Sequence, residues 1–184
     1  INTCTVTNQS DSKSRKVIRE AIRKNPNACI VAMGCYVESS KENLLDGVTI
    51  YIGNKDKSKV VDLVEEYFQN SKQIIRLYSD LGTQFEDMEI KTFEGRTRAF
   101  VKIQDGCENF CSYCIIPYVR GKCRSKSFHK VIEEITNLVE NGYQEIVLTG
   151  IHTGNYGRDL DTDFASLLRR IVEIPGLYRL RISS

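Results

Sequence analysis

The segment 106–117, "GCENFCSYCIIP", contains three cysteines within eight residues, at the spacing C-x3-C-x2-C. They are Cys107, Cys111 and Cys114, and thiolates are ligands for soft transition metals. A structural zinc site needs four closed ligands, so Cys123 or a distant residue would have to complete it. An iron–sulfur cube held by three protein thiolates would instead keep one iron open. The spacing therefore predicts a metal centre, with these two sites as alternatives.

An open iron of this kind can bind the amino and carboxylate groups of S-adenosylmethionine and pass an electron to its sulfonium. The carbon–sulfur bond then breaks to give a radical that takes hydrogen from an unactivated carbon. The cysteine spacing, with Tyr113 just before the third cysteine, resembles the radical S-adenosylmethionine superfamily. This resemblance implies that Tyr113, Thr149 and Gly150 bind the cofactor, the last two at its methionine end. A plain turn is the alternative for Thr149 and Gly150.

The composition indicates a globular protein with reduced thiols. Its 184 residues, 41% of them hydrophobic, suffice for one large domain or two small ones. Seven irregularly spaced cysteines without a secretory signature favour metal ligation or catalysis over a disulfide framework. No apolar run reaches the length of about eighteen residues that a membrane span needs. We therefore expect a cytoplasmic protein without a membrane partner.

Basic residues are concentrated after the cysteine loop, although 26 basic and 24 acidic residues give a net charge of only +2. Arg120, Lys122, Arg124 and Lys126 follow one another without an intervening acid. Such a stretch predicts a contact with RNA phosphates. A solvated basic face is the alternative.

The first part of the chain alternates between strand and helix patterns, which predicts a parallel sheet with crossover helices. The first helix is expected to start at Ser10 or Asp11. Strands are expected at the opening "INTCTVT", over 28–34 and over 48–53. A weak helix is expected near 40–46 and another helix over 56–69. The inward side chains of the second of these helices are expected to be Val60, Val61, Val64, Tyr67 and Phe68.

Residues 70–95 lose this pattern and predict a linker between a domain over 1–69 and another over 96–184. Alternation then resumes, with strands over 97–104, 145–150 and 178–184 and helices after Ser127 and around 164–172. The predicted fold class is α/β: an N-terminal parallel-sheet domain followed by the first three βα units of a partial (β/α) barrel.

Both halves together resemble the radical S-adenosylmethionine methylthiotransferases. "INTCTVT" contains Cys4 and "MGCYVE" contains Cys35, in the contexts where that family keeps two of three cysteines for a second cluster. From the residues alone, each follows a predicted strand of one parallel sheet, so both would reach the same edge. A small buried hydrophobe is the alternative. The resemblance implies two [4Fe–4S] clusters: a radical cluster on the 106–117 loop, and an auxiliary cluster on Cys4, Cys35 and an upstream cysteine.

Within this family, "INTCTVTN", "KIQDGCENFCSYCIIPYVRG" and "EIVLTGIHTGNYG" most resemble the enzymes acting on N6-threonylcarbamoyladenosine at position 37 of tRNA. The resemblance implies that one S-adenosylmethionine methylates a sulfur on the auxiliary cluster. A radical from a second would remove hydrogen from C2 of the adenine, which receives the methylthio group. The implied partners are the tRNA anticodon loop and an electron donor. Alternatives are isopentenyl-adenosine tRNA or ribosomal protein S12 as substrate, or a zinc-stabilised RNA-binding module without catalysis.

The family pattern also includes parts that this sequence does not contain: the upstream cysteine, the C-terminal half-barrel and the TRAM RNA-binding domain. Three βα units cannot close a barrel, and a bare parallel strand at a sheet edge favours association. We therefore expect a fragment of a longer enzyme that does not methylthiolate on its own.

Overall fold

The computed structural model describes residues 1–41, 43–87 and 97–183. The chain divides into two compact units. The first contains Ile1–Leu81 and Asn109–Gly121, and the second contains Gly82–Glu108 and Lys122–Ser184. The cysteine loop therefore belongs partly to each unit, because the chain leaves the second unit after Glu108 and returns to it after Gly121.

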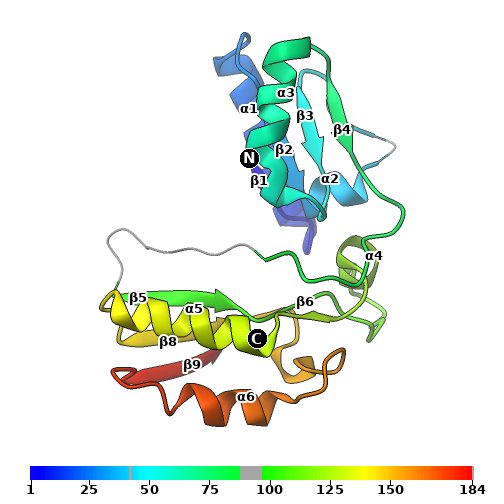
Figure 1. Cartoon of the computed structure of the whole chain (residues 1–184). Helices are drawn as coiled ribbons and strands as arrows, with labels where there is room; N and C mark the ends of the chain where they lie inside the picture. The colour runs from blue at the N-terminus through cyan, green and yellow to red at the C-terminus, as the bar shows by residue number, and fades with distance from the viewer. Residues whose placement is uncertain (42, 88–96, 184) are drawn as a thin grey trace. The chain divides into compact units, whose positions relative to one another are not determined.

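The first unit is built on a four-stranded parallel sheet in the order β1-β2-β3-β4 (Figure 1). Its central strands are short and apolar, which is typical of strands covered on both faces. Because all four strands are parallel, their carboxyl ends lie at one edge of the sheet. The strands are β1 (Asn2–Thr3), β2 (Val31–Gly34), β3 (Ile50–Ile52) and β4 (Ile74–Arg76).

Helices cover both faces of this sheet. On one face, Ile18 packs with Ala32 and Tyr51, and on the other Leu63 packs with Ile50 and Ile52. Successive strand residues thus contribute to opposite clusters, as the pleat requires. The helices of this unit are α1 (Asn8–Lys24), α2 (Cys35–Ser39), the 3-10 turn η1 (Lys57–Lys59), α3 (Val60–Asn70) and α4 (Ile116–Arg120).

The second unit contains a three-stranded parallel sheet, in the order β5-β8-β9, and a short antiparallel pair, β6-β7. The strands are β5 (Arg98–Lys102), β6 (Gln104–Asp105), β7 (Arg124–Ser125), β8 (Glu145–Thr149) and β9 (Arg179–Ser183). Helices α5 (Phe128–Glu140) and α6 (Phe164–Ile171) pack on the sheet, and the 3-10 turn η2 (Thr153–Asn155) follows β8. Their shared core consists of Ala99, Val101, Val131, Ile135, Leu138, Ile146, Leu148, Leu167 and Ile171, among others.

The predicted α/β class and the parallel strands are confirmed. In the second unit the three parallel strands β5, β8 and β9 alternate with the two helices α5 and α6, as in the first βα units of a barrel. Within the described residues, no helix is long and apolar enough to cross a membrane.

Several predicted details of the first unit are wrong. Among the described residues of the weak helix expected near 40–46, that is 40, 41 and 43–46, none is helical, and the short helix α2 instead follows β2 directly. In α3, Val61 and Phe68 are 63% and 69% exposed, and Leu63 is the buried residue. The first helix is capped by Thr7, whose hydroxyl accepts a hydrogen bond from the Ser10 amide.

The predicted linker over 70–95 is also partly wrong, because β4 lies inside it and pairs with β3. The sequence "IIR" is too short for its periodicity to indicate a strand, and only its pairing partner identifies it. Residues 88–95 of the predicted linker lie outside the described residues.

Candidate metal-binding cysteines

Cys4 and Cys35 directly follow two neighbouring strands of the first unit, Cys4 after β1 and Cys35 at the start of α2. The register of β1 and β2 pairs Thr3 with Gly34, so the next residue on each strand is a cysteine. Neighbouring strands lie about 4.8 Å apart, which is within the reach of two thiols that share a metal cluster. The register places both cysteines directly after paired strand residues, and their joint binding of a metal stays a prediction.

Gly34 makes this close approach of the two strand ends possible. Its φ is 104° and its ψ is −158°, a region that is essentially restricted to glycine. A Cβ at this position would lie 2.7 Å from the Thr3 carbonyl oxygen and 2.8 Å from Asn2 Oδ1. Any side chain here would push β1 away from the turn that carries Cys35.

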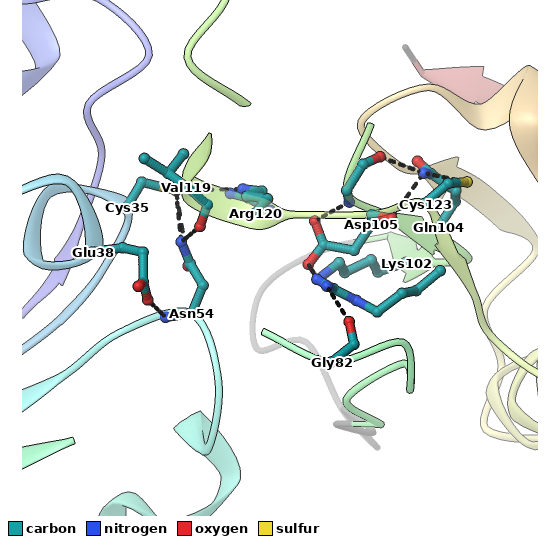
Figure 2. Close-up of polar contacts among 12 residues, drawn as sticks. Cys35, Glu38, Asn54, Gly82, Lys102, Gln104, Asp105, Val119, Arg120 and Cys123 are labelled. Atoms are coloured by element: carbon teal, nitrogen blue, oxygen red, sulfur yellow. Dashed lines mark hydrogen bonds and ion pairs between the residues drawn. The ribbon is translucent and has the colours of Figure 1, made fainter. Parts of the chain in front are cut away.

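The Cys35 sulfur is buried and receives hydrogen bonds from nitrogen donors of the first unit. Arg120 Nε lies 3.3 Å from Sγ, and Asn54 Nδ2 lies 3.5 Å from it (Figure 2). The same Asn54 amide donates to the Val119 carbonyl at 2.6 Å, and the Asn54 backbone N–H donates to Glu38 at 2.8 Å. Donors directed at sulfur stabilise negative charge on a thiolate ligand, and they hold the side chain in one orientation.

Cys4 has an ordered backbone and an exposed side chain. Its N–H donates to the Ser14 hydroxyl at 3.1 Å, and that hydroxyl donates to the Cys4 carbonyl at 2.9 Å. Ser14 is buried in the first turns of α1, so the strand end is fixed to the helix that follows. The Cys4 thiol itself is free and accessible.

The loop with the other three cysteines has no regular secondary structure before α4. Cys107 is buried and belongs to the second unit, whereas the exposed Cys111 and half-buried Cys114 belong to the first. Left-handed backbone at Gly106 and Phe110 (φ 73° and 46°) bends the loop, and the Cys114 N–H donates to the Cys111 carbonyl at 2.9 Å. All three thiols are free of disulfides.

Within the residues that the structure describes, no group of three or more His, Cys, Asp or Glu side chains is close enough to hold a metal ion. The described side chains do not form a preassembled metal site, so the chemistry of the donor atoms decides whether a cluster can bind. Three free thiols on an irregular loop, and two at adjacent strand ends, are the soft ligands that iron–sulfur clusters use. The donor set fits such clusters.

The residues expected to bind S-adenosylmethionine differ in their surroundings. The Tyr113 ring is 90% exposed and is available for contact. Thr149 ends β8, where its hydroxyl donates to the Val101 carbonyl at 3.3 Å. Gly150 follows at the carboxyl edge of the second sheet, against the side chain of Gln104.

Two of the four basic residues expected at RNA phosphates are buried, and the structure corrects this expectation. Lys126 is only 2% exposed, and its ammonium lies 2.7 Å from both Asp87 and Glu134. Arg124, 4% exposed, donates to the Gly82 carbonyl and lies 3.7 Å from Asp105. Their charges are used inside the second unit.

The remaining two basic residues stay accessible to different degrees. The Lys122 side chain is exposed, whereas the Arg120 side chain is half-buried and donates a hydrogen bond from Nε to the Cys35 sulfur. Charge density along the sequence did not distinguish these four residues, because a cation's partners come from distant segments.

Asn54 and Gln104 were not predicted as site residues. Asn54 follows β3 in "YIGN" and thus sits at the same sheet edge as Cys4 and Cys35, so its position was a usable signal. Gln104 was counted within a predicted strand. Its side chain contacts the next two residues, Asp105 and Gly106, but also Cys123 and His152, which are 19 and 48 residues away, so no local pattern could indicate the complete set of contacts.

Comparisons with known proteins match both parts of the chain. Residues 101–184 match the family model of the Radical SAM superfamily, and residues 1–53 match that of Uncharacterized protein family UPF0004.

Similar curated proteins align over nearly the whole chain. It is 45% identical to threonylcarbamoyladenosine tRNA methylthiotransferase MtaB of Bacillus subtilis, covering 100% of this chain and 42% of that protein. It is 42% identical to the protein of the same name from Chlamydia pneumoniae, covering 100% and 41% respectively. It is also 34% identical to tRNA-2-methylthio-N(6)-dimethylallyladenosine synthase of Pelotomaculum thermopropionicum, covering 98% and 43%. The chain thus spans less than half the length of these relatives.

Proposed function

We propose that this chain carries the cluster-binding part of a radical S-adenosylmethionine methylthiotransferase that modifies N6-threonylcarbamoyladenosine at position 37 of tRNA. The two family matches and the similarity to the two MtaB proteins support this proposal. The structural observation that supports it is the register of β1 and β2, in which the paired residues Thr3 and Gly34 directly precede Cys4 and Cys35, in a chain that also contains the C-x3-C-x2-C loop.

In this proposal the 106–117 loop holds the radical cluster through Cys107, Cys111 and Cys114. When bound, a [4Fe–4S] cluster with an open iron supplies the one-electron reduction of S-adenosylmethionine. Thiolates from this loop leave one position unfilled by protein, and Tyr113 and the segment from Thr149 to Gly150 bind the remainder of the cofactor.

The auxiliary cluster is held by Cys4, Cys35 and a further thiolate. Asn54 and Arg120 direct N–H groups at the Cys35 sulfur, so this ligand keeps its orientation when the metal is removed. When bound there, this cluster would supply the sulfur that becomes the methylthio group.

The substrate is the anticodon loop of tRNA, and the enzyme works in the cytoplasm with an external electron donor. Lys122 contacts phosphate, with Arg120 as a second, half-buried cation. Arg124 and Lys126 form ion pairs inside the second unit and are not part of this contact.

Anaerobic reconstitution with iron and sulfide tests the metal. The expected product is a brown protein whose sulfur-to-iron absorbance falls in Cys111→Ala. The matched control is Cys29→Ala, because Cys29 packs against the apolar cluster of the first sheet and is not among the proposed ligands. Stoichiometric zinc without iron uptake would favour the zinc-stabilised module.

Nucleoside mass spectrometry of tRNA from cells lacking the gene tests the substrate. Loss of the 2-methylthio form of N6-threonylcarbamoyladenosine is expected, with return on complementation by the wild-type gene and not by its Cys111→Ala variant. Loss of the isopentenyl-adenosine derivative would overturn the substrate and leave the chemistry. Loss of neither, with altered ribosomal protein S12, would exclude tRNA as the substrate.

A further inference from the structure

Gln104 is a buried amide at the carboxyl end of the second sheet. It opens β6 and has no solvent exposure. Its side-chain nitrogen lies 2.6 Å from the Gly106 carbonyl, 2.9 Å from the Asp105 carbonyl and 3.2 Å from the Cys123 sulfur (Figure 2). Its side-chain oxygen accepts the backbone N–H of His152 at 2.8 Å. Both ends of one amide are therefore used.

These partners belong to two loops of the second unit that are far apart in the sequence. The carbonyl of Gly106 immediately precedes Cys107, the first cysteine of the metal-binding loop. The amide of His152 comes two residues after Gly150, in the loop that follows β8. One side chain thus fixes the start of the cysteine loop to the loop expected to hold the cofactor's methionine end.

Gly150 lies against Gln104 at a position where a side chain would not fit without movement of its neighbours. A Cβ at that position would lie 3.1 Å from both Cβ and Oε1 of Gln104 and 3.2 Å from its carbonyl oxygen. Contacts this short force a neighbour to move, and Gln104 has no free space because it is completely buried. The glycine therefore lets the second loop approach the amide closely enough for the His152 bond.

The chemistry of the site requires an amide. Two carbonyl oxygens face Nε2 and need a donor, whereas the His152 N–H faces Oε1 and needs an acceptor. A carboxylate would offer only acceptors to the two carbonyls, and an apolar side chain would leave all these groups unsatisfied in a buried setting, at a cost in free energy for each.

We propose that Gln104 is a positioning residue that sets the Cys107 end of the metal-binding loop relative to the Gly150–His152 segment, and thereby the geometry in which S-adenosylmethionine binds. This inference rests on the proposed function for the identity of the cofactor. The positioning itself is a property of the metal-free chain.

The first experiment uses the iron-free protein and compares Gln104→Glu with Gln104→Met. Glu keeps the acceptor for His152 and loses the donor, whereas Met, of similar shape, loses both. Alkylation of the buried Cys107 by iodoacetamide reports on the first loop, and hydrogen exchange at the His152 amide reports on the second. We expect Cys107 to react about tenfold faster in both variants, as the loss of one buried hydrogen bond implies. The His152 amide should exchange faster in Gln104→Met alone.

The matched control is Gln73→Glu. Gln73 also donates its side-chain amide to a backbone carbonyl, that of Val48 at 2.8 Å, but it lies in the first unit. This substitution should change neither Cys107 alkylation nor His152 exchange. If Cys107 were alkylated at the same rate in Gln104→Glu and wild type, the proposal would be overturned.

The second experiment measures the Kd for S-adenosylmethionine by equilibrium dialysis with the iron-loaded protein. A merely structural residue would lower the melting temperature and leave this Kd unchanged, which would also overturn the positioning role. We expect affinity to fall about tenfold in both variants. If the wild-type, iron-loaded protein bound no S-adenosylmethionine, the cofactor part of this inference would fail together with the proposed function. The alkylation and exchange data would still decide whether Gln104 joins the two loops.

Discussion

Replacing Gly34 by alanine tests whether the close approach of β1 and β2 is what brings Cys4 and Cys35 together. The backbone at Gly34 lies in a glycine-only region, which costs an alanine about 1–3 kcal/mol. The added Cβ would also lie 2.7 Å from the Thr3 carbonyl oxygen, well inside the roughly 3.3 Å of a close carbon–oxygen contact. Relief of that overlap by backbone movement adds about 1–3 kcal/mol.

We therefore expect Gly34→Ala to lower the free energy of unfolding by about 2–6 kcal/mol. Gly142→Ala is the matched control, because Gly142 also has a positive φ, 93°, but a Cβ there would meet nothing within 4 Å. It should lose only about 1–2 kcal/mol, the cost of left-handed backbone for an L-residue. Urea unfolding followed by circular dichroism measures both.

The same variants separate stability from ligand geometry. In the full-length enzyme, which supplies the third thiolate, Cys107, Cys111 and Cys114 are replaced by alanine, so that any cluster formed on reconstitution with iron and sulfide is held at the strand ends. Gly34→Ala should reduce that iron content at temperatures where the protein is still folded, and Gly142→Ala should not. Equal stability losses in the two glycine variants, or unchanged iron in Gly34→Ala, would refute the role assigned to this strand contact.

Three further predictions concern buried charges and thiols. Burial alone would raise the pKa of Asp87, but hydrogen bonds from Lys126 and Lys130 outweigh it and hold the pKa below its usual value. Its contribution to stability is therefore complete above the unfolded pKa and is lost as pH falls through the lowered folded pKa; Asp87→Asn should flatten the acid limb of an unfolding-versus-pH curve. Lys126→Gln should cost about 3–5 kcal/mol, because it breaks a buried ion pair, and should leave the salt dependence of tRNA binding unchanged. Lys122→Gln should instead leave stability unchanged and lower the slope of log K for tRNA binding against log salt by about 0.7–0.9, the value for one phosphate contact. Filter binding measures this slope. If the slope fell in Lys126→Gln and not in Lys122→Gln, Lys126 and not Lys122 would contact the RNA. Burial raises the pKa of the Cys123 thiol, so in the iron-free protein iodoacetamide should modify the exposed Cys111 at neutral pH and Cys123 only in more alkaline solution, as peptide mass mapping would show.

Much of the fold could be predicted from the sequence because its information is local. The helix over Phe128–Glu140 and the strand over Glu145–Thr149 follow from apolar spacing and from Gly142, whose positive φ ends the helix. Short elements such as β4, with three residues, and α4, with five, were missed because they contain too few residues to show a periodic pattern. The pattern of "IIR" indicates nothing until β3 supplies its hydrogen-bonding partner, and α4 begins within an irregular loop.

The candidate site also has features that the sequence predicts and features that it does not. The spacing of Cys107, Cys111 and Cys114 is written in the chain, because three thiols within eight residues point to metal binding whatever surrounds them. The exposure of each thiol, and the donors on Cys35, depend on segments more than fifteen residues away.

By itself, the sequence determined the residue types that can bind metal, the α/β class and the order of the main elements, because apolar period and cysteine spacing are properties of neighbouring residues. Only the tertiary structure decided which groups share a site. Strand register paired Thr3 with Gly34, the residues before Cys4 and Cys35. Lys126 and Arg124 are buried and form ion pairs inside the second unit, and the buried amide of Gln104 bonds to two loops that are distant in the sequence. The physical reason is that burial and hydrogen-bond partners are supplied by chain segments that meet only when the sheets form.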